Sequence, residues 1–385
     1  MYKIKTMNKI TKQGLDIFAK DKYQINDTEE NPEAIIVRSA SLLDMNLNSD
    51  LKAIARAGAG YNNVPVDRCT EAGIIVFTSP GANANAVKEL AVASIIMASR
   101  NILDGVNWAK TLTKDVAKEV EVGKSKFVGH EIHGKSLGII GVGSVGSLTA
   151  NAGVALGMDV LGVDPYMTVE TAMTLSRSVK RAYDNETIFK KSDYIVLHAI
   201  LTSETKNMIN KDSIAQMKEG VNIINLSRAE LVNDDDMAEA LESGKVGAYV
   251  TDFPNEKVLK MKNAIPIPHL GASTPESEEN CAIMAVNQIV DYLENGNIKN
   301  SVNYPDLVMS RNGDIRICIL HKNVSGVISN VTTVLSGLGI NITNFTNRSK
   351  GDNAYTICEI DGELPEGLIE ALSNISEIIR INVIR

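Results

Sequence analysis

A glycine-rich segment, GVGSVG at residues 141–146, has the GxGxxG spacing of turns that bind dinucleotides. An apolar, strand-like stretch precedes it, and Asp164 ends the next such stretch 18 residues after Gly146. In such turns Gly141 would permit the tight bend, Gly143 would let the backbone approach a pyrophosphate, and Gly146 would let helix and strand pack closely. The helix N-terminus would face the phosphates with free N–H groups. Asp164 would bind the ribose diol and repel a 2′-phosphate, so the segment predicts NAD as the cofactor.

A second group of residues could move a proton and bind an acid. Proton transfer at a hydroxyl group near neutral pH calls for a side chain such as histidine. His269 lies just after a strand-like stretch, whereas His198 also ends a strand and is interpreted as a structural histidine beside the cofactor turn. Arg228 directly follows an apolar stretch, where its guanidinium could bind a carboxylate through two N–H groups. Glu256, taken alone, reads as a surface residue.

These side chains need a sheet to position them. From residue 136 to 251, apolar strands alternate with helices, which predicts a parallel sheet with right-handed crossovers. Before it, strands are predicted at 34–38 and 73–77, a helix-to-strand segment at 51–56 and a buried helix at 85–100.

A long helix is predicted at 274–295, because a threonine, a proline and a glutamate open it and Asn-Gly ends it. The polar segment 297–305 is interpreted as a linker. The remaining residues, 306–385, follow the order βαββαβ, which is the ferredoxin-like pattern.

Composition excludes several classes of protein. The chain has 385 residues, a net charge of -8 and 4% aromatic residues, which argue against a nucleic-acid or membrane-surface protein. No apolar run is long enough for a membrane span, and the N-terminus lacks the apolar core of a signal peptide. The four cysteines are far apart, so reduced thiols in the cytoplasm are expected. No metal site is expected.

Several segments together resemble the NAD-dependent D-2-hydroxyacid dehydrogenases, and within them the short type that acts on D-3-phosphoglycerate. RAGAGYNNV at 56–64 is similar to the family's substrate loop, and the stretches at 78–90 and 135–146 resemble its TPxxNxxxVAE and GKxLGIIGxGxIG segments. Residues 225–233 and 251–256, together with PHLGA at 268–272, resemble the segments that carry its catalytic groups.

The resemblance implies a fold and a domain order. It implies an α/β chain with a doubly wound parallel-sheet (Rossmann) NAD-binding domain at 98–283. This domain would be inserted in a flavodoxin-like substrate-binding domain, made of 1–97 and 284–303. An ACT-like regulatory domain with the ferredoxin-like pattern would occupy 304–385.

The resemblance also assigns roles to residues. His269 would be the acid/base on the C2 oxygen, Glu256 would hydrogen-bond His269, and Arg228 would hold the substrate carboxylate. The implied cofactor contacts are Gly141, Gly143, Ser144, Val145, Gly146, Asp164, His198, Ser227, Asp252 and Gly271. The implied substrate contacts are Arg38, Arg56, Ala59, Gly60 and Lys124, with the three basic residues receiving the phosphate.

The tail has its own resemblance. Residues 321–326 followed by 339–341 are similar to the ligand loop of ACT domains that bind serine, with His321, Asn323 and Asn341 as the implied contacts. The alternative is a module that only dimerises. Either interpretation implies a homo-oligomer, a dimer or a tetramer.

The expected activity is therefore NAD-dependent oxidation of 3-phosphoglycerate to 3-phosphohydroxypyruvate, the first step of serine synthesis, with L-serine as an effector. One alternative is reduction of glyoxylate, hydroxypyruvate or another 2-keto acid. Another is a binding protein that senses a dinucleotide without turnover, which the presence of Arg228, Glu256 and His269 disfavours.

Overall fold

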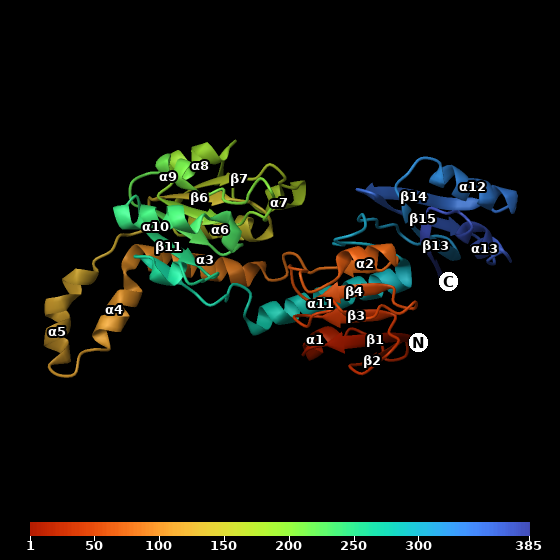
Figure 1. The fold of residues 1–385 in the computed structure, drawn as a ribbon, viewed down its shortest axis with the longest axis horizontal. Helices are drawn as coiled ribbons and strands as arrows, with labels where there is room; N and C mark the ends of the chain where they lie inside the picture. Colours follow the sequence, from red (N-terminus) through yellow and green to blue (C-terminus); the bar gives the residue numbers. More distant parts are fainter. The chain divides into compact units, whose positions relative to one another are not determined.

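The structure is a computed structural model that describes residues 1–385, and the chain divides into two compact units. The first unit contains Met1–Asn83 and Glu278–Arg385, and the second contains Ala84–Ser277 (Figure 1). None of the helices combines the length and the apolar content that crossing a membrane requires.

The second unit is built on a seven-stranded parallel sheet. Its strands are β6 (Ser136–Ile140), β7 (Asp159–Val163), β8 (Lys180–Arg181), β9 (Tyr194–Leu197), β10 (Val221–Asn225), β11 (Val246–Thr251) and β12 (Ala264–Pro266). Their order is β12-β11-β10-β9-β6-β7-β8, so the chain reverses direction across the sheet between β6 and β9. In doubly wound sheets ligands bind at the carboxyl ends of the strands beside this reversal. The glycine turn follows β6 and therefore lies at that point.

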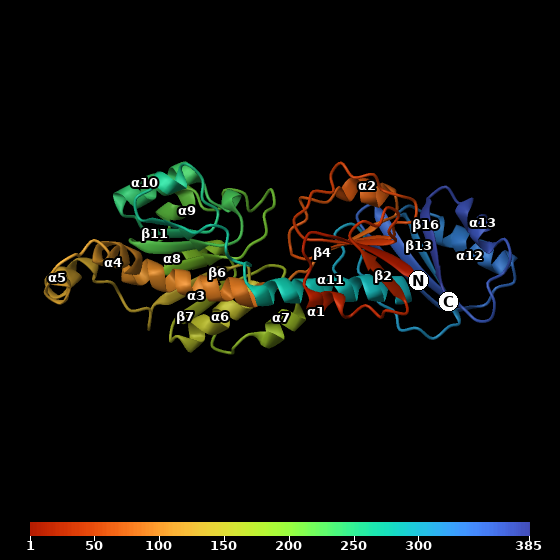
Figure 2. The same cartoon turned by 90° about the horizontal axis from the view of Figure 1, so that it is seen from below.

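Helices cover both faces of this sheet because its strands are apolar on both sides. Figure 2 shows α9 and α10 on one side and α3 and α6 on the other. The helices are α3 (Ala84–Arg100), α6 (Ser144–Ala155), α7 (Val169–Thr174), α8 (Asn185–Lys191), α9 (Lys211–Ala215) and α10 (Asp234–Ser243), with short 3₁₀ helices at Ala229–Leu231 and Val258–Lys260.

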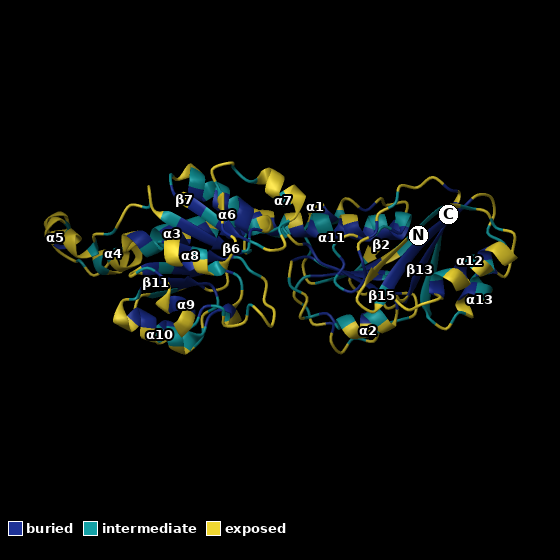
Figure 3. Ribbon diagram, turned by 90° about the horizontal axis from the view of Figure 1, so that it is seen from above, coloured by how far each residue is buried: buried dark blue, intermediate teal, exposed yellow.

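Two helices of the second unit lie away from its sheet. They are α4 (Ile102–Ala109) and α5 (Val116–Gly123), followed by a 3₁₀ helix, η1 (Lys124–Phe127) (Figure 1). No residue of α4 is buried, and Figure 3 shows α5 as exposed. We call residues 102–127 the arm.

The first unit contains a five-stranded parallel sheet in the order β2-β1-β3-β4-β5, which is the flavodoxin-like order. Its elements are β1 (Tyr2–Met7), α1 (Lys12–Leu15), β2 (Tyr23–Asn26), β3 (Ala34–Val37), β4 (Ala53–Arg56), α2 (Val66–Glu71), β5 (Ile75–Phe77) and, in part, α11 (Pro275–Asn295). The predicted helix-to-strand segment at 51–56 contains strand only. The predicted strands at 34–38 and 73–77 and the long helix at 274–295 agree with β3, β5 and α11 to within a few residues, whereas β1 and β2 were not predicted.

The segment 297–305 is not the linker that its polar composition suggested. Ile298 and Tyr304 are fully buried, and Ile298 pairs with Leu307. Asn303 replaces a strand neighbour for β5, because its side chain accepts from the Val76 N–H at 3.0 Å and donates to the Ile74 carbonyl at 2.9 Å. The prediction was wrong because asparagine favours loops by bonding to backbone, and here it makes those bonds inside the core.

The C-terminal part of the first unit is a four-stranded antiparallel sheet with the predicted βαββαβ order. Its elements are β13 (Ile315–Lys322), α12 (Val327–Gly337), β14 (Ile342–Lys350), β15 (Asn353–Ile360), α13 (Leu368–Ser373) and β16 (Ile378–Ile384), and the strands lie in the order β14-β15-β13-β16.

This antiparallel sheet is covered on both faces. Along β13, Ile317 and Ile319 pack against α12 and α13, whereas Cys318 and Leu320 belong to the same core cluster as β1, β5 and α11. Successive side chains of a strand point to opposite faces, so the alternation divides β13 between two cores. The hydroxyl of Tyr355 also donates to the Gly296 carbonyl at 2.6 Å. The C-terminal sheet is therefore integrated into the first unit.

Candidate active site

The glycine turn has the geometry that a bound pyrophosphate needs. Gly141 has φ +91°, and a Cβ there would lie 2.6 Å from the carbonyl carbon of His198. A Cβ at Gly146 would lie 2.0 Å from the Gly141 oxygen, so neither position tolerates a side chain. Gly143 differs, because nothing lies within 4 Å of where its Cβ would be. The open space lies at the N-terminus of α6, which no side chain caps. The first turn of α6, including Ser144 and Val145, can therefore donate to an anion.

Asp164 follows β7 and hydrogen-bonds to the backbone of the glycine turn. Its Oδ2 accepts from the Val142 N–H at 2.9 Å, and its Oδ1 accepts from the Tyr166 N–H at 2.8 Å. A carboxylate has about four lone-pair positions, and two remain for a ribose diol. The residue is half-buried, so a ligand can reach it.

Replacing Asp164 by Ala is expected to weaken NAD binding and to reduce the preference for NAD over NADP by about tenfold or more. The expected change corresponds to the loss of a charge-assisted hydrogen bond of roughly 1.5–3 kcal/mol and of repulsion toward a 2′-phosphate. Titration of the protein with NADH and NADPH measures both effects. Asp159→Ala is the matched control, since Asp159 begins the same strand and is exposed. An unchanged ratio of the two affinities in Asp164→Ala would show that the ribose is held by other groups.

His198 connects the turn to β9. Its Nε2 lies 3.0 Å from the hydroxyl of Thr149, and that hydroxyl donates to the Val145 carbonyl at 3.1 Å. The Nε2 nitrogen must therefore be the donor, which fixes the tautomer. Burial lowers the pKa of His198 to about 4, so the ring is neutral near pH 7. His198 is thus suited to holding α6 in place and not to exchanging protons.

Arg228 and Ser227 lie in the loop after β10. Asn225, fully buried at the end of β10, donates to the Arg228 carbonyl at 2.8 Å, and Ser227 donates to the Leu197 carbonyl at 2.8 Å. The guanidinium of Arg228 bonds only to the neighbouring Ser227 carbonyl at 2.6 Å, and the residue is exposed. The loop is therefore held rigidly while most of its arginine donors are free for a ligand. The sequence reasoning missed Asn225, although an asparagine at a strand end is a turn signal.

His269 lies beyond β12 in a strained backbone conformation. Its φ is +30°, and its N–H donates to the Asp252 carbonyl at 3.0 Å. Positive φ at a non-glycine residue is uncommon and often marks functional sites. The imidazole stacks obliquely on the Phe253 ring, with centroids 4.7 Å apart, and its other side is exposed.

Glu256 does not meet His269 in this structure. The hydrogen bond implied by the family resemblance is absent, and Glu256 is exposed without a hydrogen-bond partner. The loop after β11 places the Phe253 ring against the imidazole, so it is Phe253 and not Glu256 that contacts His269.

Asp252 is the buried acid of the site. Burial raises its pKa, although the Gly271 N–H, which donates to its Oδ2 at 3.0 Å, and the charges of His269 and Arg228 act in the opposite direction. Its Oδ1 is buried without any hydrogen-bond partner. An unpaired buried acceptor calls for a donor, and the carboxamide of a nicotinamide ring carries one. The residues of the second unit thus fit NAD at three points, namely the glycine turn, Asp164 and Asp252.

The predicted substrate contacts fall into two places. Arg38 follows β3 and pairs with Glu278 at 2.8 Å, while Arg56 ends the neighbouring β4 and donates to the Arg38 carbonyl at 3.0 Å. Gly58 has φ +149°, a backbone conformation that other residues rarely adopt, and a Cβ there would lie 1.8 Å from the movable end of the Arg56 guanidinium. Ala59 and Gly60 continue the same loop. Lys124, by contrast, lies on the arm and pairs with Glu121, away from the sheet of its own unit.

The predicted serine contacts are only partly accessible. His321 is buried, and its ring nitrogens hydrogen-bond to the Lys322 carbonyl at 2.9 Å and to Thr356 at 3.0 Å. Asn323 is exposed and donates to the Gly351 carbonyl, and Asn341 is exposed.

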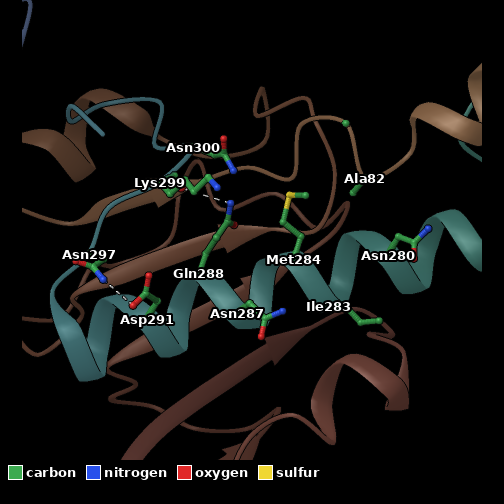
Figure 4. Close-up of a pocket in the computed structure, with 11 residues that line it drawn as sticks. Ala82, Asn280, Ile283, Met284, Asn287, Gln288, Asp291, Asn297, Lys299 and Asn300 are labelled. Carbon is green, nitrogen blue, oxygen red and sulfur yellow. Dashed lines mark hydrogen bonds between the residues drawn. The ribbon is translucent and has the colours of Figure 1, made fainter. Parts of the chain in front are cut away.

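The first unit also contains a groove of about 540 Å³ along α11 that none of the predicted site residues lines. One face of α11 forms its floor, and Figure 4 shows Gln288 reaching toward Lys299 across it. The polar lining residues are Asn280, Asn287, Gln288, Asp291, Asn297, Lys299 and Asn300. The polar residues of α11 at 280, 287, 288 and 291 recur at helical spacing and therefore could have been identified as a polar stripe on one face.

Comparison with known proteins supports the NAD-binding interpretation of the second unit. Residues 92–271 match the D-isomer specific 2-hydroxyacid dehydrogenase, NAD binding domain family. The chain is 35% identical over 269 residues to a hydroxypyruvate reductase from Thermotoga maritima, covering 67% of this chain and 83% of that enzyme. It is 31% identical over 325 residues to a D-3-phosphoglycerate dehydrogenase from Methanocaldococcus jannaschii, covering 82% of this chain and 60% of that enzyme. The chain thus spans about three fifths of that second relative.

Among solved structures, NAD⁺-bound 3-phosphoglycerate dehydrogenase from Entamoeba histolytica superposes with a TM-score of 0.60 and 26% identity, covering 80% of this chain and 99% of that one. The chain belongs to the family of D-isomer specific 2-hydroxyacid dehydrogenases, and its second unit carries that family's NAD-binding domain.

Proposed function

We propose that the chain oxidises 3-phosphoglycerate to 3-phosphohydroxypyruvate with NAD. The observation that carries the proposal is the placement of Arg228, Asp252 and His269 at the carboxyl edge of the sheet that also holds the glycine turn. Relatives named D-3-phosphoglycerate dehydrogenase from several organisms match over most of this chain.

In this mechanism Arg228 holds the substrate carboxylate through its free guanidinium donors. His269, whose ring is exposed, accepts the proton of the C2 hydroxyl on a ring nitrogen, and the C2 hydrogen leaves with its electron pair as hydride. Bound NAD would supply the hydride acceptor. The chain's own contribution is to fix these groups, which Asn225 does for the Arg228 loop and the Asp252 carbonyl does for His269.

The phosphate of the substrate is assigned to Arg38 and Arg56, which end neighbouring strands, with the N–H groups near Ala59 and Gly60 meeting the carboxylate. Lys124 is retained as a phosphate contact only if a second copy of the chain supplies it. The hydroxypyruvate reductase from Thermotoga maritima favours a second candidate, reduction of an unphosphorylated 2-keto acid.

We expect 3-phosphoglycerate to give NADH formation at alkaline pH with the product trapped, and D-glycerate to be at least tenfold poorer in kcat/KM. L-serine is expected to lower the rate, with Asn323 and Asn341 on the C-terminal sheet as its contacts and residues 304–385 as the regulatory domain. Absorbance at 340 nm, with and without L-serine, measures both expectations. Activity with hydroxypyruvate alone would favour the reductase. NADH binding without turnover of any 2-hydroxy acid would favour a dinucleotide sensor.

We also propose that the chain forms a homo-oligomer through the arm. Ile102, Leu103, Val106 and Val122 are all exposed there, with Val122 at 71%, and contiguous exposed apolar surface marks interaction sites. Light scattering is expected to give a mass at least twice 41.6 kDa. The double substitution Val106→Asp with Val122→Asp should reduce it to that of one chain, whereas Val308→Asp, an exposed valine of the first unit, should not. A monomeric wild-type protein would contradict the proposal.

A further inference from the structure

A cavity of about 320 Å³ lies within the first unit, where β16 of the C-terminal sheet faces β1 and the end of α11. Its polar lining includes Lys52, Tyr292, Arg380 and Asn382. None of these residues belongs to the candidate active site or to the loop expected to contact serine. Water occupies about 30 Å³ per molecule in the liquid, so a ligand of about ten non-hydrogen atoms would fit.

Arg380 is a half-buried cation that forms no ion pair within 4 Å, although the Asp50 carboxylate lies near enough to oppose the lowering of its pKa. Its guanidinium donates to the backbone carbonyls of Leu51 and Ser49, and no carboxylate lies within 4 Å of it. Burial lowers the pKa of Arg380, although an arginine keeps its charge near neutral pH. Buried charges in proteins are normally paired. By comparison, Lys52 in the same cavity is directly paired with Glu33 at 2.9 Å, whereas Arg380 has only the more distant Asp50 as a counter-charge.

Tyr292 supplies an unused donor in the same cavity. Its ring is 3% exposed, and its oxygen accepts from the side-chain amide of Asn382 at 3.1 Å. Burial raises the pKa of Tyr292 and the nearby Arg380 charge opposes that rise, so the hydroxyl stays protonated and its hydrogen faces no acceptor. A buried donor without a partner is costly. A ligand with negatively charged oxygen atoms would therefore suit both the Arg380 guanidinium and the Tyr292 hydroxyl.

We propose that this cavity binds a small carboxylate or phosphate anion, held by the guanidinium of Arg380 and the hydroxyl of Tyr292. The anion would bridge the C-terminal sheet, through β16, and the last turns of α11. The proposal is independent of which substrate the active site takes, because no residue is shared between the two.

Isothermal titration of the full chain tests this, with inorganic phosphate and succinate as separate probes at constant ionic strength set by sodium chloride. Saturable binding of at least one probe to the wild-type protein is expected, and the stronger probe identifies the preferred anion. Arg380→Gln should weaken that binding at least fiftyfold. Because Arg380 also holds the loop at residues 49–51, Tyr292→Phe is the variant that isolates the ligand contact, and it should weaken binding five- to tenfold with little change in Tm.

Arg348→Gln is the matched control, since Arg348 is an exposed arginine on β14 of the same sheet. This variant should bind the anion probe with the same affinity as the wild-type protein. Binding that is unchanged in Tyr292→Phe and lost in Arg228→Gln would place the anion in the active site and overturn the proposal. Binding lost equally in Arg348→Gln, or no saturable binding of either probe, would also overturn it.

Discussion

Replacing His269 by Gln is expected to lower kcat for 2-hydroxy-acid oxidation by a factor of about 10²–10⁴ while leaving the affinity for NADH within about twofold. General acid–base catalysis contributes rate factors of this size, and glutamine keeps the length of the side chain but cannot take up the proton. NADH affinity should persist because the glycine turn and Asp164 hold the cofactor through other strands, β6 and β7.

The pH profile separates a proton-transfer role from a structural one. The wild-type log(kcat/KM) should show an acid limb that reports the base in the free enzyme, and this limb should be lost in His269→Gln. His133→Gln is the matched control, since His133 is exposed in the same unit and lies outside the site. A His269→Gln variant with wild-type kcat and an unaltered profile would refute the assignment.

The strain at His269 adds a second measurable effect. Asparagine tolerates positive φ better than most residues do, and the φ of residue 269 is +30°. His269→Asn should therefore be at least as stable as His269→Gln while being equally inactive. Thermal unfolding of the two variants measures this. The comparison shows that the loss of activity comes from the missing imidazole and not from a collapsed loop.

Features fixed by residues close together in the sequence could be predicted, whereas features fixed by contacts between distant segments could not. The glycine turn was predictable because its fingerprint is local: Gly141 and Gly146 are fixed by contacts with the turn itself and with the neighbouring His198 backbone. For His198, the structure gives a hydrogen-bonding contact with Thr149 of α6 and a pKa lowered by burial, and its part in cofactor binding stays a prediction.

The absence of a contact between Glu256 and His269 could not be predicted in the same way. It depends on the path of the loop between Phe253 and Glu256, which places the Phe253 ring against the imidazole. Residue types in a motif state which groups are present, but the loop conformation decides which of them touch.

The C-terminal sheet shows a different limit. Its βαββαβ order was predicted from the sequence, because the apolar runs at β13 and β15 alternate with the helical segments at α12 and α13. The same runs gave no sign that Cys318, Leu320 and Tyr355 would face the core of the first unit. A strand buried on both faces has no polar alternation, so its sequence does not reveal what covers its second face. Asn303 in the segment 297–305 misled the interpretation for a related reason, since its amide serves the core and not solvent.

Breaking the ion pair between Arg316 and Glu359 should have the largest effect on stability, at about 3–5 kcal/mol for Arg316→Met. Both side chains are fully buried, and Glu359 accepts from Arg316 Nε at 2.9 Å and from Asn344 at 2.9 Å. Arg316 also donates to the Asn295 carbonyl at the end of α11. Removing the arginine would leave an uncompensated carboxylate in the core beneath β15.

The double variant Arg316→Met with Glu359→Leu should recover most of this loss, because well-packed apolar side chains can replace a buried pair at little cost. Lys190→Met is the control, since Lys190 and Glu186 form an exposed pair whose loss should cost less than about 1 kcal/mol. Urea unfolding followed by circular dichroism measures all three. A loss of stability below about 1 kcal/mol for Arg316→Met would show that water reaches Glu359 and that the ion pair is not buried in solution.

The pair also predicts how stability depends on pH. Burial alone would raise the pKa of Glu359, but the hydrogen bonds from Arg316 and Asn344 outweigh it and the pKa lies below its usual value. A lowered native pKa means that the unfolded chain binds this proton first, so the stabilisation is complete above the ordinary glutamate pKa of about 4.3 and is lost as pH falls through the native value. The wild-type protein should therefore lose stability more steeply below pH of about 4.5 than the double variant does. If the free energy of unfolding changed with pH equally in the two proteins, the native and unfolded pKa values of Glu359 would be the same. The charge of Glu359 would then add nothing to the stability of the C-terminal sheet.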